Sequence, residues 1–459
     1  MPRKAQPVVR RLGPLGHPAR LTVVGFLAVN LLGAALLTLP ISSESGTWTD
    51  PVTALFTSTS AICVTGLVVV DTSTYWSGFG EALVLGLIQV GGLGIMTAAS
   101  LLGLLVARRM GLRMQLIAQA ETKALRLGET RRVVLGVVAM SLAIEFVTAS
   151  ILTARRFTST DESFGSALYY GVFHAISAYN NAGFALHEDS LVRHVADPWI
   201  IVPITIAFVL GGIGFPVVFE TVRALRARLR GTPVLGWSLH TKVTVLTYGG
   251  LTVLGVVLVT ALEWSNPGTL GTLSYPGRLL AGAFHGLSPR TAGFNSVDVG
   301  SMHSTTLLVN DVLMFVGGGS AGTAGGIKVT TFALLAFVVY AEVRGQPSVH
   351  VMGRRLAASV QRQAITVVLL AVGVVMIATT ILLGLSVHRL DAVLFEVVSA
   401  FGTVGLSTGI TADLPAAGHL LLVLVMFLGR VGPITLASAL ALREYERRYE
   451  LPEERPIVG

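Results

Sequence analysis

Long apolar stretches recur along the chain and alternate with short polar links. Four stretches lack Asp, Glu, Lys and Arg altogether, at residues 21–43, 82–107, 199–219 and 243–262. About 20 apolar residues suffice for a helix to cross the hydrocarbon core of a membrane. Since backbone polar groups in lipid must bond within their own segment, these stretches predict helices. A transmembrane barrel would show short alternating segments instead.

Between the apolar stretches, one short pattern occurs four times. Residues 55–67 read LFTSTSAICVTGL, 172–184 read VFHAISAYNNAGF, 394–406 read LFEVVSAFGTVGL, and a shorter copy, FHGLSPRTAGF, covers 284–294. In three copies a Phe lies ten residues before a Gly, and the fourth is one residue shorter. Such self-similarity predicts a fold built from repeated units.

Each repeat predicts a spanning helix, a short helix, a Gly-containing turn and a second spanning helix. The short helices, predicted near 51–62, 167–179, 277–288 and 390–401, cannot cross a membrane and should re-enter it from outside. Non-helical backbone at membrane depth is tolerated only where it is buried in protein or lines a water-filled path. The fold class is therefore an all-α polytopic membrane protein with four tandem helix–pore-loop–helix repeats around a single pseudo-fourfold pore. The predicted repeats are 1–107, 108–226, 227–343 and 344–459, the last with a C-terminal tail. The pore loops lie near 51–67, 167–184, 277–294 and 390–406. The first spanning helices lie near 21–43, 133–154, 243–262 and 363–387. The second lie near 82–107, 199–222, 307–343 and 414–442.

The turns share a glycine rather than a charged side chain, which favours a cation filter made of backbone carbonyls. Glycine adopts at low cost the unusual dihedral angles that aim successive carbonyls at one axis. The alternative is that these glycines only aid helix packing. The predicted filter residues are Val64, Thr65, Gly66, Asn181, Ala182, Gly183, Thr291, Ala292, Gly293, Thr403, Val404 and Gly405.

Carboxylates follow the turns at a regular spacing. Asp71, Glu188 and Asp298 each lie five residues after the turn glycine, and Asp413 lies three places later than that in the fourth repeat. A ring of carboxylates at an outer mouth would concentrate cations. Ordinary solvation of a loop is the alternative.

Charge is scarce but informative. Hydrophobic residues make up 52% of the 459 residues and charged residues 13%, with a net charge of +8. The basic residues cluster in 3–20, 108–132, 223–242, 344–362 and 443–455, so the positive-inside rule places these segments and both termini in the cytoplasm. We therefore expect contact with membrane lipid and no nucleic acid. One cysteine, Cys63, supports neither a disulfide nor a metal cluster, so we expect no bound cofactor and no metal besides the permeant ion.

These turns resemble the pore loops of the Trk/Ktr/HKT superfamily of potassium transporters, and the length without extra helices is most similar to its Ktr-type bacterial membrane subunit. The resemblance implies K⁺ uptake across the bacterial plasma (inner) membrane, a homodimer with one pore per subunit, and a partner ring of cytosolic nucleotide-binding regulatory subunits (KtrA- or TrkA-like). Glycine at all four filter positions implies K⁺ rather than Na⁺ as the permeant ion. The resemblance also implies that Na⁺ is a candidate activating ion. It does not distinguish channel-like conduction from symport as the transport mechanism.

A glycine-rich segment should break the second helix of the third repeat. Six glycines lie between positions 317 and 326, each costing roughly 1 kcal/mol relative to Ala in a helix. A nucleotide-binding loop is rejected, because no strand precedes the segment. The resemblance implies an intramembrane gating loop, with a kink that does not gate as the alternative. The predicted gate comprises Gly317, Gly318, Gly319, Ser320, Ala321, Gly322, Thr323, Ala324, Gly325, Gly326, Lys328 and Arg430.

Three basic residues lie in apolar surroundings. Arg430 interrupts the run 414–442, and a charge within the membrane is a functional candidate. Lys328 has the alternative of reaching the inner interface. Arg290 lies three residues before Gly293. We expect its side chain behind the filter, bonded to carbonyls or to an acid, with Glu396 and Glu145 as candidate partners.

Three other functions compete with a K⁺ pore. A Na⁺-permeable or poorly selective channel would have the same architecture. A non-conducting scaffold for the cytosolic ring is the second. An intramembrane enzyme is the third, and the absence of G-x-S-x-G and H-E-x-x-H motifs argues against it.

Overall fold

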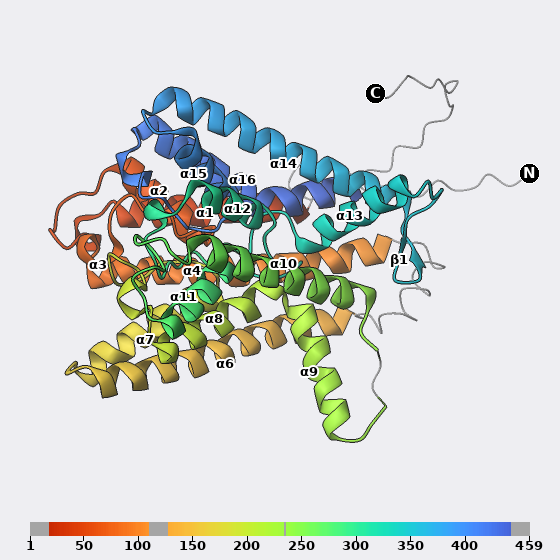
Figure 1. Cartoon of the computed structure of the whole chain (residues 1–459), viewed down its shortest axis with the longest axis horizontal. Helices are drawn as coiled ribbons and strands as arrows, with labels where there is room; N and C mark the ends of the chain where they lie inside the picture. The colour runs from red at the N-terminus through yellow and green to blue at the C-terminus, as the bar shows by residue number, and fades with distance from the viewer. Residues whose placement is uncertain (1–17, 110–126, 234–235, 442–459) are drawn as a thin grey trace, which may run out of the picture.

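The computed structural model describes residues 18–109, 127–233 and 236–441, and it is almost entirely helical. Long helices run roughly parallel through the molecule, with shorter helices packed between them at one end (Figure 1). The long helices are α1 (Pro18–Leu37), α4 (Gly78–Arg109), α6 (Leu127–Ser159), α10 (Leu239–Glu263), α14 (Ala358–Leu385) and α16 (Ala416–Ala441). The predicted all-α membrane fold is confirmed.

Two of the passes are interrupted. One comprises α8 (Pro198–Ile213) and α9 (Phe215–Leu229), and the other comprises α12 (Ser304–Phe315) and α13 (Val329–Val343). We expected a single helix over 199–222, and this is wrong. Gly214 has a φ of 98°, and α9 leaves α8 at an angle of 106°.

Within the described residues, three helices are long and apolar enough to cross a membrane, namely α6, α10 and α14, and α8 with α9 makes a fourth if the bent pair is one pass. Shorter apolar stretches occupy α1, α4, α12, α13 and α16. If α12 and α13 are taken as one broken pass, these helices account for the eight expected crossings.

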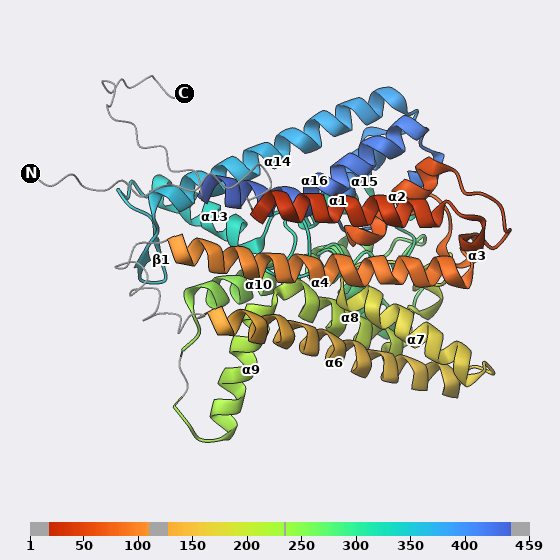
Figure 2. The same ribbon diagram turned by 180° about the vertical axis from the view of Figure 1, so that it is seen from behind.

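Four short helices lie between the long ones, and each agrees with its prediction to within a few residues. They are α2 (Pro51–Ile62), α7 (Phe164–Tyr179), α11 (Tyr275–Leu287) and α15 (Leu390–Gly402). Side-chain caps start the first three. For example, Asp50 accepts hydrogen bonds from the Val52 and Thr53 amides at 3.0 and 3.1 Å. In each repeat the short helix packs against the first long helix, and α16 of the fourth repeat also packs against α1 and α2 of the first. The four repeats therefore close into a ring. Figure 2 shows α1 and α4 of the first repeat in front, with α15 and α16 of the fourth repeat on one side and α6 and α7 of the second on the other.

Small elements complete the chain. At the end of the bundle where the short helices lie, which we call the outer end after the predicted topology, are α3 (Thr72–Tyr75) and four 3-10 turns, η1 (Pro40–Ser42), η2 (Val192–His194), η3 (Val299–Ser301) and η4 (Thr411–Asp413). At the opposite end, between α13 and α14, strands β1 (His350–Val351) and β2 (Arg354–Arg355) form a two-residue antiparallel hairpin.

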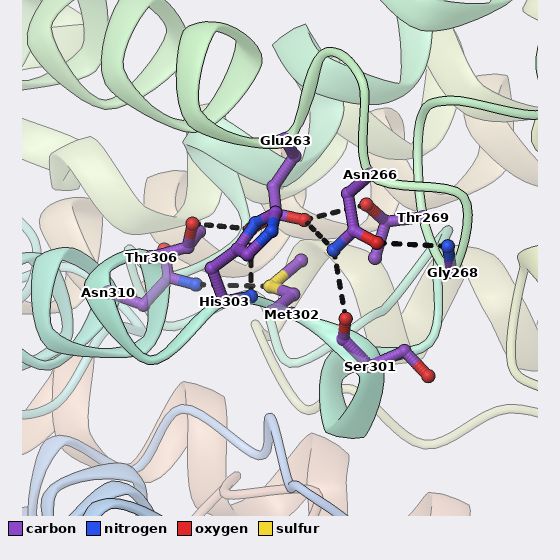
Figure 3. Close-up of polar contacts among 9 residues, drawn as sticks. All are labelled: Glu263, Asn266, Gly268, Thr269, Ser301, Met302, His303, Thr306 and Asn310. Atoms are coloured by element: carbon purple, nitrogen blue, oxygen red, sulfur yellow. Dashed lines mark hydrogen bonds and ion pairs between the residues drawn. The ribbon is translucent and has the colours of Figure 1, made fainter.

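A buried carboxylate fixes the outer end of the third repeat. Glu263, at the end of α10, is fully buried and accepts hydrogen bonds from donors on both sides of it (Figure 3). Asn266 Nδ2 donates at 2.6 Å and Thr269 Oγ1 at 2.7 Å from the following loop. The His303 amide, at 3.0 Å, and the Thr306 hydroxyl donate from the start of α12. This network ties α10 to the helix that leads into the glycine-rich segment.

Candidate functional site

The four turns that follow the short helices adopt the same backbone conformation. In each turn, the glycine that the four copies share and the residue two positions before it both have positive φ values, between 48° and 95°. The pairs are Val64 and Gly66, Asn181 and Gly183, Thr291 and Gly293, and Thr403 and Gly405. A non-glycine residue in this left-handed region costs on the order of 1–2 kcal/mol. The same strain repeated in four turns indicates a geometry that the surrounding structure enforces.

The four turn glycines meet one another in a closed ring. A Cβ atom added to any of them would lie within 2.8 Å of backbone in the next turn, so no side chain fits between neighbours. The contacts run from Gly66 to Ala182, from Gly183 to Gly293, from Gly293 to Val404, and from Gly405 to Thr65. Each turn thus touches the next in chain order, and the last touches the first.

A serine braces each turn from behind. Ser60 lies six residues before Gly66, donates to the Leu67 carbonyl at 2.7 Å and accepts from the Gly66 amide at 3.1 Å. Ser177 and Ser288 donate to the carbonyls of Phe184 and Phe294 at 2.7 and 2.5 Å. Ser399 accepts from the Gly405 amide at 3.1 Å. These braces were missed in the sequence, although the Ser-Ala pair in three of the four copies was a signal for them.

The short helices point their C-terminal ends at the ring. A helix C-terminus carries about half a negative charge from its aligned peptide dipoles. Four such ends converge on the turns through the residues that cap them, Cys63, Asn180, Ser288 and Thr403. The arrangement favours a cation at the ring without any carboxylate in the turns themselves.

An outer cavity of about 450 Å³ opens onto the ring. All four turn glycines line it, together with Asp71, Glu188 and Asp298. The structure thus brings these three carboxylates to one cavity, whereas Asp413 is not among the residues that line it. Asp71 and Asp298 also cap α3 and η3, since they accept from the amides of Ser73 and Gly300 at 2.9 and 3.0 Å.

The glycine-rich segment lies against the ring on the side opposite the outer cavity. Residues 316–328 are non-helical, as predicted, and link α12 to α13. A Cβ on Gly325 would lie 2.0 Å from Thr403 Oγ1, and one on Gly317 would lie 3.4 Å from Thr291 Cγ2. Thr323 donates its hydroxyl hydrogen bond to Asn181 Oδ1 at 2.8 Å. The segment therefore contacts three of the four turns.

Backbone hydrogen bonds fasten this segment to the broken end of α8. The amide of Gly319 donates to the Gly212 carbonyl at 2.8 Å, and the amide of Thr323 donates to the Gly211 carbonyl at 3.1 Å. A Cβ on Gly319 would lie 2.0 Å from the Ile213 carbonyl oxygen. The close approach requires glycine on the loop, and the break at Gly214 leaves the last carbonyls of α8 available to accept.

Two cations hold the segment from below. Arg430 of α16 is 3% exposed, donates to the Thr323 carbonyl and donates to the Gly91 carbonyl of α4 at 3.3 Å. Lys328 donates to the Ala324 carbonyl at 2.5 Å, so its amine turns back to the segment rather than to the inner interface. A guanidinium that bridges the segment to α4 is suited to fixing the segment under the ring.

Arg290 lies behind the third turn and bonds a carbonyl, one of the two kinds of partner expected for it, whereas the candidate acids Glu396 and Glu145 are not its partners. The side chain is fully buried, donates to the Tyr248 carbonyl at 3.4 Å and lies 4.6 Å from the centre of the Tyr248 ring. Glu396 instead accepts from the Thr408 amide at 3.0 Å and the Thr411 hydroxyl at 2.9 Å.

Glu145, the other candidate partner of Arg290, belongs to the second repeat. It accepts from Gln89 Nε2 at 3.1 Å and from Asn180 Nδ2 at 3.3 Å. Both buried glutamates therefore position pore-loop backbone, Glu396 through the segment after the fourth turn and Glu145 through the cap of α7.

Glycines in the second helix of three repeats were also missed as packing sites. A Cβ on Gly91, Gly211 or Gly429 would lie 1.9–2.0 Å from the carbonyl oxygen of Ile62, Tyr179 or Phe401, each near the end of a short helix. Helix packing therefore requires glycine at these three positions, whereas turn geometry requires it in the four turns. The helix-packing role that was considered as the alternative for the turn glycines belongs to Gly91, Gly211 and Gly429.

The comparisons with known proteins match this architecture. Residues 16–446 match the family described as TrkH, cation transport protein. The Ktr system potassium uptake protein B of Bacillus subtilis is 39% identical over 96% of this chain and 97% of its own length, and its namesake in Vibrio alginolyticus is 38% identical over 97% and 95%. The potassium/sodium uptake protein NtpJ of Enterococcus hirae is 30% identical over 96% and 97%.

A solved structure shares the fold. The potassium transporter TrkH from Vibrio parahaemolyticus superposes with a TM-score of 0.70 at 16% identity, covering 93% of this chain and 86% of that one. The family match spans nearly the whole chain, including all four turns and the glycine-rich segment. A family of cation transporters also removes the intramembrane enzyme from consideration. The chain belongs to the TrkH family of cation transport proteins.

Proposed function

We propose that this chain forms a K⁺-selective uptake pore, with the four turns as its filter and residues 317–328 with Arg430 as its gate. The observation that carries the proposal is the closed ring of four turns with one shared backbone conformation. Carbonyls held in such a ring replace the hydration shell of a dehydrated cation. The relatives named as potassium uptake proteins support K⁺ as that cation.

The finer parts of the proposal concern assembly and orientation. The chain works as a homodimer in the bacterial plasma membrane, with both termini in the cytoplasm and a cytosolic ring of nucleotide-binding subunits against the end that bears α9 and β1–β2. Na⁺ acts as an activating ion, and Asp71, Glu188 and Asp298 concentrate cations at the outer mouth. The relatives named as components of a Ktr system support a membrane subunit that works with partners.

A less selective pore is the second candidate. The Enterococcus hirae relative is named a potassium/sodium uptake protein and is 30% identical to this chain. Both candidates share the ring, so only ion competition separates them.

The test measures Rb⁺ flux and its competition by K⁺ and Na⁺, first with purified protein in liposomes and then in bacteria that lack K⁺ uptake and carry a regulatory subunit. Gly66→Ser is the filter variant, because a Cβ there would meet the Ala182 carbonyl oxygen at 2.4 Å and the φ of 93° strains any L side chain. Gly86→Ser is the matched control, since nothing lies within 4 Å of a Cβ at that position.

We expect Rb⁺ flux from the wild type that K⁺ inhibits and Na⁺ does not, with K⁺ preference lost in Gly66→Ser and kept in Gly86→Ser. Equal inhibition of the wild type by Na⁺ and K⁺ would favour the less selective pore. No flux from well-folded protein would favour a scaffold. Selectivity unchanged by Gly66→Ser would contradict the filter assignment.

A further inference from the structure

The helix α9 carries an arginine-lined groove that the pore does not use. α9 leaves α8 at 106° and projects out of the bundle beside α6, roughly perpendicular to the long helices, as Figure 1 shows. Its segment 215–230 contains four arginines and one glutamate. A helix with this composition and orientation is typical of a membrane interface, where its apolar side faces the acyl chains and its basic side faces the headgroups.

A groove of about 720 Å³ runs between α9 and α6. Its walls are apolar, and three arginines lie along it one turn or so apart; the lining residues are Met140, Val218, Phe219, Val222, Arg223, Arg226, Ala227, Arg230 and Thr232. Met140 belongs to α6, whose neighbouring side chains Leu135 and Leu142 are more than half exposed. The groove therefore connects a lipid-facing surface to a row of guanidinium groups.

The position of α9 is fixed rather than incidental. Glu220, near its start, accepts from the Ser238 amide at 2.6 Å, from the Ser238 hydroxyl at 2.8 Å and from the Thr241 hydroxyl, all at the start of α10. Both carboxylate oxygens of Glu220 are thus committed to α10. Among the described residues, the side chains of Arg223, Arg226 and Arg230 form no ion pair.

We propose that this groove binds an anionic phospholipid from the adjacent leaflet, with the acyl chains along Met140, Phe219 and Val222 and the phosphate against Arg223, Arg226 and Arg230. Charge complementarity supports an anion, because three guanidiniums face the groove and no carboxylate lines it. Leu225 and Leu229, exposed at 56% and 78% beside the arginine row, favour lipid over a soluble anion, since a helix surface that meets only water would not present them. The site rests on the membrane location of the fold and is independent of K⁺ selectivity.

The experiment titrates purified, delipidated full-length protein with phosphatidylglycerol or phosphatidylcholine and counts bound lipids by native mass spectrometry. The test variant is Arg223→Gln/Arg226→Gln/Arg230→Gln. The charge-matched control is Arg228→Gln/Arg344→Gln/Arg355→Gln, which removes three arginines that do not line the groove. The conservative variant Arg223→Lys/Arg226→Lys/Arg230→Lys keeps the charge, and melting temperatures check that all variants fold.

We expect the wild type, the control and the lysine variant to bind the first phosphatidylglycerol more tightly than phosphatidylcholine, and the glutamine variant to lose that preference by on the order of tenfold. Excess glycerol phosphate should leave phosphatidylglycerol bound, because the apolar wall retains the acyl chains. Displacement by glycerol phosphate would assign the groove to a soluble phosphate and overturn the proposal. An equal loss of the preference for phosphatidylglycerol in the glutamine variant and in the control would also overturn the proposal. Unchanged phosphatidylglycerol preference in the glutamine variant would likewise overturn the proposal.

Discussion

At the scale of single residues, the proposed pore depends on side chains that bond its backbone. Ser60, Ser177, Ser288 and Ser399 bond the turn backbone, and Arg430 bonds the glycine-rich segment. Each acts through main-chain carbonyls or amides. Their loss should therefore change geometry and dynamics before it changes charge in the ion path.

Arg430→Gln should raise the basal Rb⁺ flux of purified protein in liposomes. The substitution removes charge-assisted hydrogen bonds to the carbonyls of Thr323 and Gly91, each contributing roughly 1.5–3 kcal/mol, so the segment under the ring should open at least about ten times more often. Arg362→Gln is the control, because this arginine is exposed on α14. Flux equal to that of the wild type would remove Arg430 from the gate.

His187 should make the outer part of the second repeat less stable in acid. Burial first, and then Arg193 and Arg156, lower the pKa of His187 from its ordinary 6.5 to about 4. Between pH 7 and pH 5 the unfolded chain gains a proton at this residue and the folded protein does not, so the free energy of unfolding falls as pH falls. With allowance for partial exposure the loss is on the order of 1 kcal/mol.

The measurement is the melting temperature in detergent at pH 7 and at pH 5 for wild type and His187→Gln. We expect a smaller acid-induced decrease in the variant, which cannot take up the proton. An equal decrease in both proteins would show that His187 titrates normally.

At the scale of elements, the largest difference between the helices predicted from the sequence and those in the structure is at the broken helices. The break at residues 316–328 was predicted, because six glycines in ten residues weaken a helix at every turn. The bend at Gly214 was not, because Gly211, Gly212 and Gly214, followed by Pro216, lie within an apolar run that is also long enough to span a membrane as one helix. Whether the helix continues or breaks there depends on tertiary contacts. Here the glycine-rich segment donates hydrogen bonds to the last carbonyls of α8, at Gly211 and Gly212, and the helix breaks.

The short helices were predicted to within three residues, because re-entrant elements have sharp ends set by capping side chains and by the turn glycine. The positive φ values at Val64, Asn181, Thr291 and Thr403 could not be predicted, since these residue types disfavour that region when considered alone. Likewise the partner of Arg290 could not be selected, because the sequence offered both Glu145 and Glu396, and only packing assigns each of these carboxylates to its own donors.

Gly319→Ala should displace the glycine-rich segment from α8. Its Cβ would lie 2.0 Å from the Ile213 carbonyl oxygen, which must move, and overpacking of this kind costs about 1–3 kcal/mol. We expect a lower melting temperature together with higher basal Rb⁺ flux. Gly373→Ala in α14, where nothing lies within 4 Å of the added atom, should leave flux unchanged and melt at an equal or higher temperature. A normal melting temperature and normal flux for Gly319→Ala would contradict the described position of the segment.

At the scale of the whole molecule, the proposed pore would separate an outer cavity lined by three carboxylates from an inner segment bonded by Arg430 and Lys328. Negative charge outside and positive charge inside the filter give the ion path a polarity along its axis. The four converging helix ends lie between them and add negative potential at the ring. In the proposed pore, these charges would favour entry of cations from the outer cavity and oppose their passage where Arg430 and Lys328 lie.

Glu188→Gln should raise the Rb⁺ concentration that gives half-maximal uptake by about twofold at low ionic strength, with the maximal rate unchanged, because the carboxylate acts on the local cation concentration. The difference should shrink as choline chloride screens the outer cavity. Asp161→Asn, which removes an outer carboxylate that does not line the cavity, serves as the control. An unchanged half-saturating concentration would reduce Glu188 to a solvating loop residue.

The ring closes within one chain, because the turn that carries Gly405 contacts the turn that carries Gly66. Each quarter of the ring is therefore encoded by its own codons. In an assembly of four identical subunits, one substitution alters every quarter at once and preserves the symmetry. In this protein one substitution alters a single quarter and leaves three intact, so selection can adjust ion preference or gating in graded steps, and the four quarters are free to diverge in sequence as long as the contacts between neighbours are kept.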